Sequence, residues 1–144
     1  MTTTQSSQKT QQHDDRPSTM VWPTLSYDDA LAAIDFLTTA FGFTTTAVHT
    51  DADDPSRVVH AELAWPAGGA VMLGSAPRPE GWPDVTGRGS TYCVTDEVDS
   101  LFERAVAAGA RVLREPRDED YGSRDCVVLD PEGNMWSFGT YRGA

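Results

Sequence analysis

Apolar and polar residues follow a fixed order of patterns over the first half of the chain. Stretches in which they alternate predict strands at residues 21–26, 43–49, 57–65 and 70–75. Between the first two strands, apolar residues recur every three or four positions and predict a helix over residues 28–41. The acidic pair Asp28-Asp29 can cap this helix, and Gly42 ends it. The predicted order is therefore β-α-β-β-β.

The same order recurs in the second half of the chain. Strands are predicted at residues 91–94, 111–114, 125–130 and 135–140, with a helix over residues 96–108. Asp96, which can cap this helix, lies 67 residues after Asp29. Gly109, which ends it, lies 67 residues after Gly42. Such an internal repeat indicates two copies of one module. The modules cover about residues 20–76 and 90–141, and the linker between them covers residues 77–89.

Residues 1–19 differ from the rest because they are mostly Thr, Gln, Ser and Asp. A segment with so few apolar side chains cannot offset its ordering entropy by burial, so we expect a disordered tail. Residues 20–144 are expected to form a single domain. The predicted fold class is α+β: two βαβββ modules form a curved eight-stranded sheet around a cavity, with the helices outside.

The chain is acidic, with a formal net charge of -11. This balance argues against nucleic acid and membrane partners and mildly favours a cationic or neutral ligand, although a solvated acidic surface is an alternative explanation. No apolar run approaches the roughly 20 residues of a membrane span, and the N-terminus does not resemble a signal peptide, so a cytoplasmic location is expected. Cys93 and Cys126 are too few for a disulfide framework or a zinc site.

The segment YGSRDCVVLDPEGNMWSFGTY, residues 121–141, predicts a hairpin. In its DPEGN turn, Gly133 can take the left-handed position and Asp130 can accept backbone N–H groups. The turn is expected to be structural, because it sets the register of two neighbouring strands. That register places Ser137 on one face of the return strand and Trp136 on the other.

Four segments resemble a known family: YDDALAAIDFLTTAFGF, HAELAW with AVMLGS, TDEVDSLFERAVAAGA, and YGSRDCVVLDPEGN. Together they are similar to the vicinal oxygen chelate superfamily, which includes glyoxalases, bleomycin-resistance proteins, fosfomycin-resistance enzymes and extradiol dioxygenases. The resemblance covers most of residues 20–141. It implies the two-module fold and a homodimer that completes its sites across the subunit interface.

The resemblance also implies where a metal ion would bind in metal-dependent relatives. The positions that correspond to their ligands are Trp22, Ser90, Ser137, and Met72 or Leu73. None of these residues supplies the carboxylate and imidazole groups that such a cation requires. We therefore expect no metal and no other cofactor.

His60 and Glu62 are the candidate reactive pair. They share one face of a predicted strand, whereas Val59, Ala61 and Leu63 suit packing against the helix. The pair has several possible roles: a general base with an orienting carboxylate, two ligand contacts, a structural ion pair, or a remnant of a metal site.

The remaining candidates point to binding. The aromatic side chains suit flat or cationic ligands, whereas Trp65 and Trp136 suit the core. The candidate ligand-binding residues are Trp22, Thr24, His60, Glu62, Trp82, Tyr92, Tyr121, Arg124 and Ser137. Arg124 could instead pair with the acidic surface. The predicted function is metal-free binding of a planar or cationic small molecule, as in bleomycin resistance. The alternative is a lyase, isomerase or dioxygenase that uses His60 and Glu62 as an acid–base pair or as metal ligands.

Overall fold

The computed structural model describes residues 19–144. The prediction of a disordered tail therefore lies almost entirely outside the described residues. The first module contains β1 (Thr24–Tyr27), α2 (Ala30–Phe36), a π-helical turn η1 (Leu37–Phe41), β2 (Thr44–Thr50), β3 (Val58–Ala64) and β4 (Ala70–Ser75). The second contains β5 (Ser90–Val94), α3 (Val98–Ala107), β6 (Arg111–Asp118), β7 (Arg124–Leu129) and β8 (Met135–Gly139). No described helix has the length and apolar character needed to cross a membrane.

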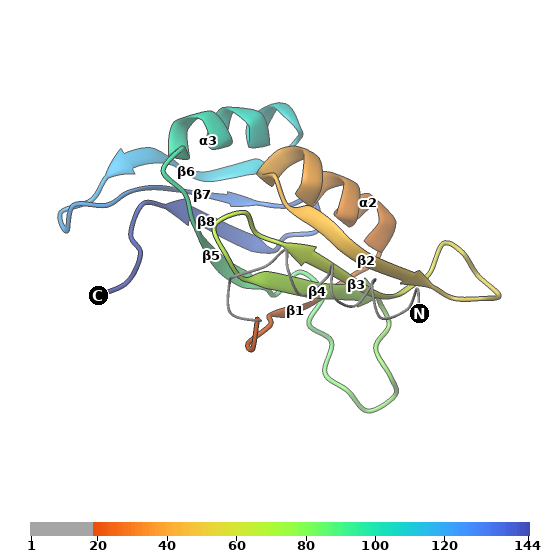
Figure 1. Ribbon diagram of the computed structural model, residues 1–144. Coiled ribbons are helices and arrows are strands. Elements are labelled where there is room, and N and C mark those ends of the chain that lie inside the picture. The colour runs from red at the N-terminus through yellow and green to blue at the C-terminus, as the bar shows by residue number, and fades with distance from the viewer. Residues whose placement is uncertain (1–18) are drawn as a thin grey trace, which may run out of the picture.

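The two modules have the same topology. Their strands form two four-stranded sheets, in the orders β1-β4-β3-β2 and β5-β8-β7-β6. In each sheet, the first strand pairs in parallel with the last strand of its module, and the other pairs are antiparallel. Both helices lie on the same side of the sheets, and the loop between β4 and β5 projects on the other side (Figure 1). The predicted two-module α+β fold is confirmed, with its eight strands divided between two sheets.

Local chemistry explains the first helix. The side chain of Asp29 accepts a hydrogen bond from the backbone N–H of Ala32, which caps α2. The chain then continues into η1, which ends at Gly42 with a φ of 88°. Only glycine adopts this left-handed conformation at little cost, so the predicted end of the helix is confirmed.

The predicted cap of the second helix is wrong. Glu97 precedes α3 and makes no side-chain capping bond. Asp96 instead forms an ion pair with Arg142, with Nη2 and Oδ2 2.9 Å apart. The hydroxyl of Thr95 accepts the backbone N–H of Glu97 at 3.0 Å, so a turn formed by Thr95 precedes this helix.

The expected inward packing of Val59 is also wrong. Between the pairs His49–His60 and Thr50–Val58, β3 has one more residue than β2. This bulge interrupts the alternation at Val59, which is 58% exposed, while Val58 is buried. Beyond the bulge the expected alternation returns, and Ala61 and Leu63 are buried.

An aromatic cluster joins the modules. The ring of Phe41 at the end of η1 lies 5.4 Å from Trp136 and 4.7 Å from Phe138 between centroids. The ring of Trp65 lies 4.9 Å from Phe43 and 5.8 Å from Phe138. Trp65 and Trp136 are buried, as the sequence predicted. The apolar face of β8 therefore packs against the first module as well as its own.

The DPEGN turn forms a second junction. Asp130 Oδ1 accepts the backbone N–H groups of Glu132 and Asn134, both at 3.0 Å, which confirms the predicted role of Asp130 in the turn. Glu132 reaches the other module, where its carboxylate accepts the N–H groups of Asp28 and Asp29 at 2.6 and 2.9 Å. The turn therefore also stabilises the N-terminus of α2.

Candidate functional site

A cavity of about 450 Å³ lies on the first module, beside β1, β3, β4 and the loop that follows β4. We call it the His60 cavity. Its lining includes Thr24, Ser26, Asp51, Arg57, Val59, His60, Met72, Gly74, Arg78 and Trp82. Three of the predicted binding residues, Thr24, His60 and Trp82, are therefore brought together here.

His60 and Glu62 form the predicted pair. His60 Nε2 lies 2.8 Å from Glu62 Oε2, and their side chains are 36% and 32% exposed. On the neighbouring strand, the ring of His49 stacks on that of His60 with centroids 6.3 Å apart. Glu62 holds one ring nitrogen of His60, and the other nitrogen can donate to or accept from a ligand.

The loop after β4 brings Trp82 to the cavity. This indole is 58% exposed. The guanidinium carbon of Arg78 lies 4.9 Å from the centroid of its ring, in a cation–π contact. Arg57, which precedes β3, donates to the carbonyls of Ala76 and Pro77 at 3.4 and 3.3 Å. These contacts tie the start of the loop to the cavity wall.

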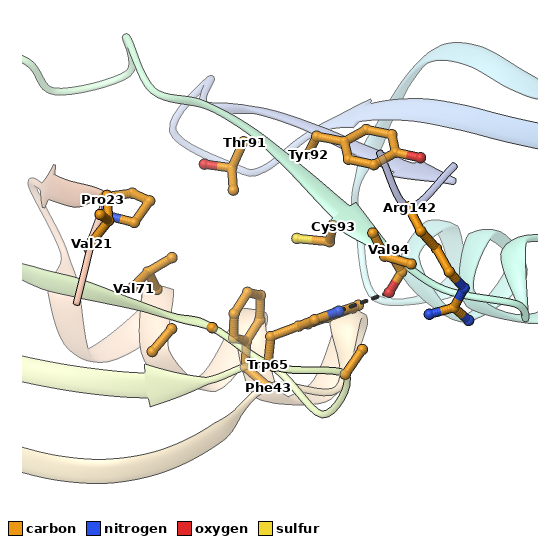
Figure 2. A pocket seen from close by; sticks show the side chains of 14 residues that line it. Val21, Pro23, Phe43, Trp65, Val71, Thr91, Tyr92, Cys93, Val94 and Arg142 are labelled. Atoms are coloured by element: carbon orange, nitrogen blue, oxygen red, sulfur yellow. Dashed lines mark hydrogen bonds between the residues drawn. The ribbon is translucent and has the colours of Figure 1, made fainter. Parts of the chain in front are cut away.

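A second cavity, of about 410 Å³, lies at the seam between the modules. Figure 2 shows Phe43 and Trp65 on one side of it and Cys93 and Val94 of β5 on the other. The indole N–H of Trp65 donates to the carbonyl of Val94 at 2.8 Å. Burial raises the pKa of the Cys93 thiol to about 12, so this thiol stays protonated and unreactive. Of the predicted binding residues, only Tyr92 lines this seam cavity.

Two other candidates on the second module, Ser137 and Tyr121, lie near Tyr92. Ser137 on β8 is the direct partner of Tyr92 on β5. Tyr121 is exposed, and its hydroxyl donates to Asp125 at 3.2 Å. Asp125 is buried and forms an ion pair with Arg114 at 2.8 Å. These side chains form a polar region on the second module, separate from the lining of the His60 cavity.

Trp22 and Arg124 line neither the His60 cavity nor the seam cavity. The indole N–H of Trp22 donates to the carbonyl of Thr19 at 3.1 Å. Arg124 pairs with Asp99 on α3 at 2.8 Å and with Asp118 at 3.2 Å. The structure therefore favours the acidic-surface alternative for Arg124.

Comparison with protein families gives a match over residues 19–138 to the Glyoxalase/Bleomycin resistance protein/Dioxygenase superfamily. The chain belongs to this superfamily. An uncharacterized protein of Mycobacterium tuberculosis is 32% identical over 139 residues, which cover 90% of this chain and 81% of that protein. The anthracycline biosynthesis protein DnrV of Streptomyces peucetius is 30% identical over 140 residues, covering 89% of this chain and 50% of DnrV.

Solved structures share the superfamily fold. TioX from Micromonospora sp. ML1 has a TM-score of 0.67 and 30% sequence identity, and the match covers 85% of this chain and 98% of TioX. Glyoxalase I from Zea mays also has a TM-score of 0.67, at 23% identity, and the match covers 88% of this chain and 46% of the enzyme. At that identity the likeness to glyoxalase I concerns the fold alone.

The side chains at the positions where the resemblance predicts metal ligands do not fit a metal ion. Trp22 precedes β1, and the residue of β1 that pairs with Met72 is Thr24. On the second module, Ser90 pairs with Met135 in the parallel strands, and Ser137 pairs with Tyr92. Hydroxyl, thioether and indole groups do not replace carboxylate and imidazole ligands. Within residues 19–144, no three His, Cys, Asp or Glu side chains are grouped so as to hold a metal ion.

Three charged residues of the His60 cavity were not predicted from the sequence: Asp51, Arg57 and Arg78. Asp51 and Arg57 flank the β2–β3 turn, and Arg78 follows a cis Ala76–Pro77 peptide bond. Each lies in a turn or loop, where strand alternation does not apply. The available signal was a proline-rich loop with one Trp and two Arg residues, and it identified only Trp82.

Proposed function

We propose that the protein binds a planar small molecule in the His60 cavity without a metal ion. The observation that carries this proposal is the position of Trp82, an exposed indole at a cavity that also contains His60. A flat ligand that stacks on this exposed indole removes apolar surface from water and makes a large contact with the ring. His60 then supplies a directional hydrogen bond, which fixes the orientation of the ligand.

The name of one relative supports a planar ligand. DnrV is named for anthracycline biosynthesis, and anthracyclines contain fused flat rings. Because this chain spans half of DnrV, the comparison supports a ligand class rather than a shared reaction. Binding without chemistry would sequester such a molecule, in the manner of a resistance protein.

The test is titration calorimetry with 2-naphthamide, an uncharged planar probe, against variants of two tryptophans. Trp82→Ala should weaken binding by roughly 1–3 kcal/mol, as found for truncated aromatic anchors. Trp22→Ala is the matched control, because Trp22 lies outside the cavity lining, and it should leave binding unchanged. Equal affinities for the wild type and Trp82→Ala would count against this site.

A second candidate function is favoured by the 2.8 Å contact between His60 and Glu62. An imidazole held by a carboxylate can act as a general base, as in other acid–base enzymes. If the protein is such an enzyme, Glu62→Gln should lower kcat more than it changes substrate affinity. If the protein only binds its ligand, His60→Ala should alter the affinity for the ligand, and neither the wild type nor the variant should show turnover.

We also propose a homodimer. The predicted binding residues are divided between the His60 cavity on one module and the Tyr92 region on the other. A second copy that placed its Tyr92 region over the His60 cavity would unite them, and exposed Val59 and Tyr121 would gain apolar cover. Light scattering at micromolar concentration should give twice the 15.6 kDa mass of the chain. A monomer would exclude such a shared site.

A further inference from the structure

We infer that the ligand of the His60 cavity carries a negative charge: it is a planar aromatic molecule with a carboxylate or a similar anionic group. This inference rests on the proposed function and adds the charge of the ligand. It reverses the sign expected from the net charge of -11, because the side chains around the cavity differ from the surface as a whole.

Within residues 19–144, four of the nine arginines form an ion pair with a carboxylate, and the two arginines of the cavity are not among them. Arg114, Arg117, Arg124 and Arg142 each form an ion pair with a carboxylate, at 2.8 to 3.0 Å. Among the residues from 19 onward, neither Arg57 nor Arg78 has a carboxylate within 4.0 Å of its guanidinium nitrogens. In a chain with 22 acidic and 11 basic residues, two arginines without such partners at one cavity are available for an external anion.

The hydrogen bonds of these arginines are long. Arg57 reaches two carbonyls at 3.3 and 3.4 Å, and Arg78 reaches the carbonyl of Pro83 at 3.4 Å. Each of these contacts is at the weak end of the range for N–H donors. A guanidinium group has five N–H donors, so both arginines retain several that can bind a carboxylate in the bidentate geometry.

The charge balance of the lining is positive. Hydrogen bonds from Ser56, with a smaller effect of the charge of Arg57, lower the pKa of Asp54, but Asp54 does not line the cavity. Asp51 is the carboxylate in the lining, and its Oδ1 accepts the N–H of Asp53 at 2.8 Å. Glu62 is held by His60. Two guanidinium groups against one lining carboxylate leave a net positive wall, before any charge on His60 is counted.

The stacking of Arg78 on Trp82 also selects against a cationic ligand. A guanidinium already occupies the favourable position over this ring, at 4.9 Å from its centroid. A second cation would be repelled by Arg78, whereas an anionic aromatic molecule can place its ring against the indole and its charge beside the guanidinium. The same two residues therefore recognise both properties of the ligand.

Three probes of one shape test the inference: 2-naphthoate, 2-naphthamide and 2-naphthylmethylammonium, titrated calorimetrically at neutral pH. We expect 2-naphthoate to bind at least about tenfold more tightly than 2-naphthamide, and the ammonium probe to bind most weakly. The preference for 2-naphthoate should decrease as salt is added, because the arginines are partly exposed to solvent.

Variants test whether the arginines of the cavity cause the preference for 2-naphthoate. Arg78→Gln and Arg57→Gln should each bring the affinities for 2-naphthoate and 2-naphthamide closer together, and Arg78→Glu should favour the ammonium probe. Arg88→Gln is the matched control, because Arg88 is exposed on the same loop but does not line the cavity. Thermal unfolding checks that each variant is folded, and Arg78→Gln decides the outcome if the Arg57 variant is not.

The outcomes separate the two proposals. If all three probes bind equally and Trp82→Ala weakens each of them, the ligand charge is wrong and the proposed function stands. If 2-naphthoate is preferred but Arg57→Gln and Arg78→Gln keep the full preference, the inference is also wrong. If none of the three probes binds, the proposed function itself fails.

Discussion

The hydroxyl of Tyr27 donates a 2.6 Å hydrogen bond to Asp130, which lies 103 residues later in the chain. Both residues are buried, and they belong to different modules. Burial, followed by the charge of Asp130, raises the pKa of Tyr27 well above its usual value, so the hydroxyl remains a donor. Asp130 Oδ2 also accepts the indole N–H of Trp136 at 3.0 Å and the amide of Asn134 at 3.2 Å. One buried carboxylate therefore organises the junction of the two modules.

Tyr27→Phe should lower the free energy of unfolding by about 1.5–3 kcal/mol, because it removes a buried hydrogen bond to a charged group. Urea denaturation measures the change. Tyr121→Phe is the matched control: its hydroxyl also donates to a carboxylate, but the side chain is exposed, and little change is expected. Equal stability of wild type and Tyr27→Phe would show that the other donors to Asp130 compensate for the lost bond.

Gly89→Ala should destabilise the same junction. A Cβ atom at Gly89 would lie 2.5 Å from Leu25 Cδ2 and 2.9 Å from Asn134 Oδ1. Both distances are too short, so the side chains of Leu25 and Asn134 would have to move from their packed positions, at a cost of roughly 1–3 kcal/mol. Thermal unfolding measures this loss, with Ser90→Ala at the neighbouring exposed position as the control. If Gly89→Ala kept the melting temperature of the wild type, the junction would be loosely packed.

The internal repeat predicted the modules because each depends on local patterns of apolar residues. The contacts between modules could not be predicted in this way. The sequence predicted that Asp130 caps its own turn, and the structure confirms this with Oδ1. The second oxygen, which binds Tyr27, depends on how the modules pack. Glu132 lies in the same predicted turn, yet its carboxylate accepts N–H groups at the N-terminus of the distant helix α2, which the sequence did not predict.

The candidate site was partly predictable for the same reason. Alternation along β3 placed His60 and Glu62 on one face, and they lie 2.8 Å apart. Val59 was misplaced because a bulge depends on the pairing with β2, which the residues of β3 do not specify. Arg57 was predicted as the first residue of the strand 57–65, but it precedes β3, so the alternation of that strand does not give its direction. Arg78 was missed because loops have no periodicity from which to infer direction.

Stability should fall at alkaline pH in a way that Cys93 partly controls. Burial raises the pKa of this thiol from 9.0 to about 12. Between these values the unfolded chain releases the proton and the folded chain retains it, so unfolding becomes more favourable as pH rises, by up to about 1.4 kcal/mol per pH unit. The contribution of the buried thiol is complete below about pH 9 and is lost progressively above it.

Urea denaturation at about pH 8 and about pH 10.5 can isolate this effect. The wild type should lose more stability between the two conditions than Cys93→Ala does. Burial also raises the pKa of Cys126, to about 11, but that group is present in both proteins, so its effect cancels in the comparison. Parallel losses in the two proteins would mean that the Cys93 thiol is accessible to solvent.

The four tryptophans differ in exposure, which gives a spectroscopic test of the candidate site. Trp65 and Trp136 are buried, whereas Trp82 is 58% exposed, so acrylamide should quench mainly the fluorescence of Trp82. A saturating non-absorbing ligand in the His60 cavity should cover that indole and lower the Stern–Volmer constant. In Trp82→Phe, the Stern–Volmer constant should be low without ligand, and adding the ligand should not change it. Trp22→Phe should keep the full ligand-dependent decrease, because Trp22 does not line the cavity. If the decrease instead disappeared in Trp22→Phe and persisted in Trp82→Phe, the ligand would bind at the N-terminal end of β1, and the His60 cavity would not be its site.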